Sequence, residues 1–195
     1  MGNTDKKLKM IDVNIDIVFI IDIFNEKDRE ADRTTLKLVE LYKSKYDCQV
    51  FVDYFNDSKD FYEMLETVRV NCEKKNVILH INGHSAQVGE NVVGFSLYDK
   101  YIVHFKKIMN VLSKINNSSH YFILNLMIMC ESTELVKEYD LPYHVISSNL
   151  KQGVGVIDKL KICFEKLAII KFEKAFDFIN INQDFSYYKA HKNNA

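Results

Sequence analysis

Two short apolar segments, each ending abruptly in a polar motif, constrain the fold of this chain more than any other feature. Residues 76–82 (Asn-Val-Ile-Leu-His-Ile-Asn) lead into Gly83-His84, and residues 121–129 (Tyr-Phe-Ile-Leu-Asn-Leu-Met-Ile-Met) lead into Cys130. Both are short and rich in β-branched or aromatic side chains, which is typical of buried parallel strands. Because chemistry gathers beyond the carboxyl ends of such strands, we expect His84 and Cys130 to lie close together.

The rest of the chain alternates between strand and helix patterns. Three further strands are predicted from apolar runs, at residues 14–24, 48–54 and 143–147. Helices are predicted from apolar residues at helical spacing, at residues 28–46, 58–74, 101–115, 132–139 and 154–179. Asp57 or Ser58 is the expected N-cap of the second helix. Loose alternation over residues 86–98 predicts a small antiparallel hairpin.

Such alternation predicts an α/β fold, namely a three-layer α/β/α sandwich with a mainly parallel sheet and a small antiparallel hairpin after His84. The length of 195 residues and the hydrophobic content of 47% fit one domain. We expect a flexible N-terminus over residues 1–13, a domain over 14–180 and a C-terminal tail over 181–195.

The composition disfavours several classes of function. A net charge of −1 with interspersed signs argues against a nucleic-acid-binding surface. The apolar runs reach only about ten residues, too short to span a bilayer, and no apolar signal core begins the chain. The four cysteines lie far apart without a CxxC motif, which favours reduced thiols in the cytoplasm.

Cys130 and His84 offer the chemistry of a cysteine nucleophile and its base. An imidazole can take the thiol proton and later deliver a proton to a leaving amine. The structural alternative is a buried cysteine beside a loop histidine. His80 lies four positions before His84, a spacing that would suit a metal on a helix, but a strand is predicted there, so neither metal nor cofactor is expected. His80 is instead expected to pack beneath the site or to orient His84.

The two motifs together resemble the caspase-like cysteine peptidases of clan CD, especially their CHAT-type branch. Those proteins show a strand ending in Gly-His-Gly and a later strand ending in Ala-Cys-Glu-Thr or similar. The matching residues here are 83–85 (Gly-His-Ser) and 129–132 (Met-Cys-Glu-Ser). Order, spacing and flanking helices agree over most of residues 14–180. Ser85 and Met129 depart from the pattern, which usually has Gly and Ala there.

The resemblance implies a cysteine endopeptidase in which Cys130 and His84 form the catalytic dyad. The backbone N–H groups of Ser85 and Cys130 would stabilise the oxyanion. Asp22, near the end of the first strand, and Ile128, two positions before Cys130, are candidate residues of the substrate pocket. Ile128 favours a neutral, apolar side chain before the cleaved bond. A role for Asp22 as a cap of the following loop fits the sequence at least as well.

The expected partners are a protein substrate and either a regulatory protein or a second copy of the chain, within a bacterial defence or cell-death pathway. The many Phe and Ile residues of 154–179 are expected either to be buried or to dock a partner. A non-catalytic caspase-like module that binds and regulates a partner remains the alternative, because Ser85 and Met129 depart from the family pattern. A small-molecule-binding domain is less favoured, since no Gly-rich loop follows the first strand.

Overall fold

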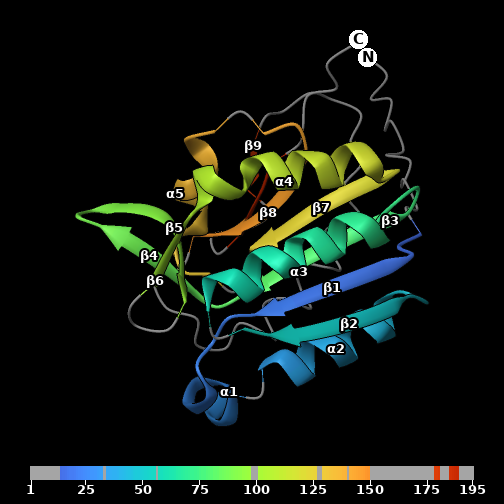
Figure 1. The fold of residues 1–195 in the computed structure, drawn as a ribbon, viewed down its shortest axis with the longest axis horizontal. Helices are drawn as coiled ribbons and strands as arrows, with labels where there is room; N and C mark the ends of the chain where they lie inside the picture. The colour runs from blue at the N-terminus through green and yellow to red at the C-terminus, as the bar shows by residue number, and fades with distance from the viewer. Residues whose placement is uncertain are drawn as a thin grey trace, which may run out of the picture.

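The computed structural model describes residues 14–32, 34–55, 57–97, 101–126, 129–139, 141–149, 178–180 and 185–188 (Figure 1). The main sheet formed by these residues has seven strands in the order β2-β1-β3-β7-β8-β10-β9. Five neighbouring strands run parallel: β2 (Gln49–Tyr54), β1 (Ile17–Asp22), β3 (Asn76–Asn82), β7 (Tyr121–Leu126) and β8 (His144–Ser148). The mainly parallel α/β fold predicted from the strand–helix alternation is thereby confirmed.

The sheet extends further along the chain than the sequence predicted. β10 (Phe185–Tyr188) pairs antiparallel with β8, and β9 (Phe178–Asn180) pairs antiparallel with β10. β10 therefore lies in the segment predicted as a tail, and Phe178 and Ile179 form a strand where a helix was expected. Short apolar runs fit either element, so periodicity alone does not separate them. Residues 154–177 of the predicted helix lie outside the described residues.

Helices pack on both faces of the sheet, which explains why the first five of the six residues of β1 are apolar. Its odd-numbered residues, such as Phe19, share a core with α3 (Ser58–Asn71) and α4 (Phe105–Ser118). Its residues Val18 and Ile20 share a second core with Leu38 and Tyr42. These two belong to α2 (Thr34–Lys45), so all six residues of β1 are buried. Figure 1 shows α3 and α4 on one side of the sheet.

Local signals place the ends of several elements close to where they were predicted. Asp57 is the N-cap of α3, as expected, because its carboxylate accepts a hydrogen bond of 3.0 Å from the backbone N–H of Asp60. The helical pattern over residues 28–46 divides into α1 (Glu26–Asp32) and α2. α5 (Ser132–Lys137) follows Cys130.

A second, smaller sheet follows β3 and corrects the predicted hairpin. β4 (His84–Val88), β5 (Asn91–Leu97) and β6 (Tyr101–His104) form three antiparallel strands. The helix expected from residue 101 begins only at Phe105. Residues 101–104 (Tyr-Ile-Val-His) are aromatic or β-branched at three of four positions, and only Val103 among them is buried. Pairing with β5 therefore decides their conformation.

We predict that Gly94→Ala destabilises this smaller sheet. A Cβ atom at Gly94 would lie 2.0 Å from the backbone oxygen of Val103 and 2.9 Å from the backbone nitrogen of Phe105. Backbone atoms cannot rotate away, so β6 has to shift, and the free energy of unfolding should fall by about 1–3 kcal/mol. Urea denaturation measures this loss. Ser96→Ala on the same strand is the control, and an unchanged Gly94→Ala midpoint would contradict the close approach.

Candidate active site at the ends of strands β3 and β7

The carboxyl ends of β1 and β3 lie where the strand order of the sheet reverses. β2 pairs with one side of β1 and β3 pairs with the other. The connection from β1 to β2 and the connection from β2 to β3 therefore cross the sheet in opposite directions. Open α/β sheets bind ligands outside the strand ends at such a point. His84 follows the end of β3 there, separated from it only by Gly83.

Gly83 allows the chain to pass close to the loop that follows β1. It is buried, and a Cβ atom added to it would lie 2.1 Å from Cγ1 of Ile23 and 2.7 Å from its Cδ1. A side chain at position 83 would therefore force Ile23 to move. Gly83 thus brings the backbone of His84 next to the loop after β1. Because of this proximity, the imidazole of His84 contacts residues of that loop and of the helix that follows it.

The imidazole of His84 is held by two residues from that loop and from α1. Its Nε2 lies 3.1 Å from Oδ2 of Asp28, and its ring packs edge-on against Phe24 with centroids 4.8 Å apart. The His84 side chain is 55% exposed, so a substrate can reach it. For His80 the sequence predicts either packing beneath the site or a hydrogen bond that orients His84, and the structure places Asp28 against the imidazole. Nothing local in the sequence identifies Asp28, because 56 positions separate the two residues.

Asp28 is itself held in place by Asn25 at the start of α1. The side-chain amide of Asn25 donates to Oδ2 of Asp28 at 2.6 Å, and the backbone N–H of Asp28 donates to the Asn25 side-chain oxygen at 2.9 Å. The second bond is the usual N-cap interaction of a helix. The capping of α1 thus also orients the carboxylate that meets His84.

Cys130 lies in the turn that immediately precedes α5. Its side chain is half-buried, and the residue after it, Glu131, has a left-handed backbone with φ 49° and ψ 25°. Such a conformation is costly for a residue with a Cβ atom, and strained backbone of this kind clusters at functional sites. Met129 is fully buried in the main core, so its side chain points away from solvent.

The turn at Cys130 is anchored on both sides. The Ser132 hydroxyl donates to the backbone oxygen of Leu126 at 2.8 Å and accepts from the backbone N–H of Ser148 at 2.8 Å. On the other side, the amide of Gln87 donates to Oε2 of Glu131 at 3.1 Å. Gln87 belongs to β4, the strand that begins at His84. The strand topology therefore brings the segments that carry His84 and Cys130 to one edge of the sheet.

Asp22 is fully buried, with its carboxylate directed at protein groups. Its Oδ1 accepts from the backbone N–H of Phe24 at 2.9 Å, its Oδ2 accepts from the hydroxyl of Thr35, and Nε of Arg29 lies 3.7 Å from Oδ1. Burial raises the pKa of the Asp22 carboxyl, while these three groups oppose the rise. Asp22 thus caps the loop after β1, which is the alternative that the sequence left open.

The remaining predicted site residues are only partly described. Ser85 is half-buried on β4 and pairs with Phe95 of β5. Ile128 lies outside the described residues, as does Cys163.

His80 belongs to a buried polar group on the α2 face of the sheet. The Tyr42 hydroxyl lies 2.8 Å from Nδ1 of His80 and accepts a hydrogen bond of 2.8 Å from the amide of Asn125. The Tyr42 hydrogen is thereby left to donate to Nδ1. Desolvation lowers the pKa of His80 to about 3, so its ring is neutral at physiological pH. His80 is therefore buried on β3 and bonded to Tyr42, which fits the packing role predicted for it and not the orienting role.

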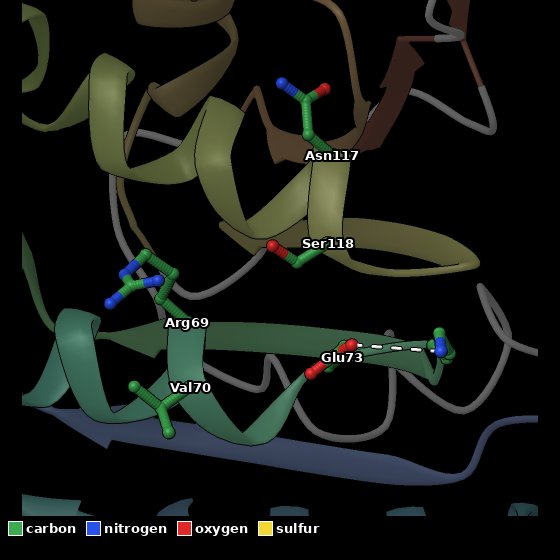
Figure 2. A pocket seen from close by; sticks show the side chains of 6 residues that line it. Arg69, Val70, Glu73, Asn117 and Ser118 are labelled. Carbon is green, nitrogen blue, oxygen red and sulfur yellow. Dashed lines mark ion pairs between the residues drawn. The ribbon is translucent and has the colours of Figure 1, made fainter.

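A shallow hollow lies far from this site, between the C-terminal ends of α3 and α4. Figure 2 shows its lining residues Arg69, Val70, Glu73, Lys74, Asn117 and Ser118. Arg69 pairs with Glu66 and Lys74 pairs with Glu73, so these cations already have partners. The carbonyl-bearing ends of two helices also disfavour an anion. The hollow therefore has little to offer an anionic ligand.

The described part of the chain carries neither a cluster of metal ligands nor a helix that could span a membrane. No three His, Cys, Asp or Glu side chains gather there as a metal site would require. None of the helices described is long and apolar enough to cross a bilayer.

No protein-family model matches the sequence, and no curated protein matches it significantly.

Proposed function

We propose that this protein is a cysteine endopeptidase of the caspase-like, CHAT type, with Cys130 as the nucleophile and His84 as the general base. The strongest support is that both residues lie beyond the carboxyl ends of adjacent parallel strands. The Gln87–Glu131 hydrogen bond links the segments that follow these strands. Helices on both faces of the sheet are compatible with the three-layer α/β/α sandwich of that family.

The mechanism would be acyl transfer in two steps. His84 takes the proton from the Cys130 thiol, and the thiolate sulfur forms a bond to the scissile carbonyl carbon. The backbone N–H groups of Ser85 and Cys130 donate to the oxyanion of the tetrahedral intermediate. His84 returns the proton to the leaving amine, and water then hydrolyses the thioester. None of these steps requires a metal or a cofactor.

The proposed substrate carries a neutral, apolar residue before the cleaved bond. Ile128 offers no counter-charge to a buried Lys, Arg or Asp side chain. The Asp22 carboxylate is buried and already accepts from Thr35 and from the backbone of Phe24, which leaves it poorly placed to receive a cation. A protein substrate, a cytoplasmic location and control by a regulatory protein or a second copy of the chain complete the proposal.

Ser85 favours a second candidate, a caspase-like module that binds and regulates a partner without catalysis. Its Cβ atom stands where the family usually has glycine, beside the expected position of the substrate carbonyl. Met129, the other departure from the family pattern, does not favour this candidate in the same way, because its side chain is fully buried in the core. The state of the Cys130 thiol separates the two candidates.

We predict that Cys130 reacts with iodoacetamide at neutral pH at least about ten times faster than Cys48 or Cys72. Cys72 is fully buried, and burial together with the Asp47 charge raises the pKa of the Cys48 thiol, so both serve as internal controls. His84→Ala should slow the labelling of Cys130 and leave that of Cys48 unchanged. Mass spectrometry of tryptic peptides gives all three rates. Equal rates for Cys130 and Cys48 would support the non-catalytic module.

A further inference from the structure

We infer that Asp28 is a positioning residue for His84, so that the proposed site works with three side chains instead of two. This inference rests on the proposed function. Oδ2 of Asp28 lies 3.1 Å from Nε2 of His84, within hydrogen-bonding distance, and both side chains lie at the end of the sheet that carries Cys130.

The contact determines which imidazole nitrogen can act as a base. A carboxylate only accepts hydrogen bonds, so a neutral His84 must carry its hydrogen on Nε2 to bond Asp28. Its Nδ1 is then the nitrogen with a lone pair, able to take the thiol proton. Asp28 thus selects the tautomer that the mechanism needs.

Contacts within and around α1 fix the position of the Asp28 carboxylate, so that it can orient His84. Asn25 holds Asp28 through two hydrogen bonds, and the ring of Phe24 lies against His84. Arg29, the next residue of α1, donates from Nε to the backbone oxygen of Phe24 at 2.8 Å and lies over the ring of Tyr54 at 4.9 Å. These contacts bind α1 to the ends of β1 and β2, so Asp28 does not depend on His84 for its position.

A purely structural role predicts something different. The side chains of Asp28 and His84 are 41% and 55% exposed, and ion pairs this exposed contribute little to stability. Asp28 also lies in the first turn of α1, where any acidic residue favours the helix dipole. Glu26 lies in the same turn, which makes Glu26→Gln the matched control for loss of a charge at that place.

The test compares Asp28→Ala, Asp28→Asn and Glu26→Gln in the full chain. ¹⁵N NMR of the imidazole nitrogens should show the Nε2–H tautomer of neutral His84 in the wild type and in Glu26→Gln, and a mixture of tautomers in Asp28→Ala. With a peptide substrate, Asp28→Ala should lower kcat about 10- to 100-fold with KM unchanged. Asp28→Asn, which keeps the cap and the size, should show an intermediate loss.

The two readouts separate this inference from the proposed function. A tautomer change in Asp28→Ala together with a wild type that cleaves no peptide would support the positioning role and overturn the peptidase. An unchanged tautomer in Asp28→Ala would overturn the positioning role whether or not the wild type is active. An equal loss of kcat in Glu26→Gln would also overturn it, because the helix charge would then explain the effect.

Discussion

Replacing Cys130 with alanine is expected to lower the rate of peptide cleavage at least about a thousandfold. The thiolate sulfur of Cys130 forms the covalent bond to the substrate, and no other atom of the site can replace it. His84→Ala should cause a loss of similar size, since the thiol then has no base within the site. Turnover of a peptide library or of a protein substrate measures both losses.

The losses of cleavage rate caused by Cys130→Ala and by His84→Ala should not be additive. Sulfur and imidazole act as one unit, so the double variant Cys130→Ala/His84→Ala should be no slower than either single variant. Cys48→Ala, at a half-buried cysteine on the loop before β2, is the control. Circular dichroism should show each variant folded, since Cys130 is only half-buried and His84 is mostly exposed. Cleavage that survives Cys130→Ala would exclude the mechanism.

Acid should weaken the fold through His80. In the unfolded chain this imidazole takes up a proton near pH 6.5, whereas in the folded protein its pKa is about 3 because the ring is desolvated. Between these values the unfolded state binds the additional proton, so the free energy of unfolding falls as pH falls. The slope is roughly 1.4 kcal/mol per pH unit, or roughly 3 kcal/mol from pH 6.5 to pH 4.

The Asp22 carboxyl changes the stability with pH in the opposite direction to His80. Burial raises the pKa of its carboxyl, so the folded state takes up that proton more readily than the unfolded state and gains stability as pH falls. The contribution of His80 must therefore be measured as a difference between the wild type and His80→Gln. Glutamine is neutral at every pH, and its side-chain oxygen can still accept from the Tyr42 hydroxyl.

Urea denaturation from pH 7 to pH 4 tests this prediction. The wild type should lose stability toward acid more steeply than His80→Gln, by roughly 3 kcal/mol over the range. His120→Gln, at an exposed position just before β7, controls for the removal of one histidine. Parallel curves for the wild type and His80→Gln would mean that the folded protein protonates this ring as readily as the unfolded chain does.

Local patterns in the sequence were sufficient for the elements of the parallel sheet and for their order along the chain. A strand buried on both faces is apolar at most of its positions, so the runs that became β1, β3 and β7 could be recognised without neighbours. The Asp57 cap of α3 could be recognised for the same reason, because its hydrogen bond spans three positions. Position at a strand end was likewise enough to select His84 and Cys130 as candidates.

Contacts between residues far apart in the sequence decided the short strands β6 and β10 and the partner of His84. β6 and β10 are short strands whose conformation depends on β5 and β8, so their own residues did not distinguish strand from helix or tail. The choice of Asp28, and not His80, as the neighbour of His84 depends on the chain bringing α1 next to the start of β4. Buried polar groups take whichever partner the packed chain brings within hydrogen-bonding distance, and that partner is set by three-dimensional proximity, which spacing along the sequence does not encode.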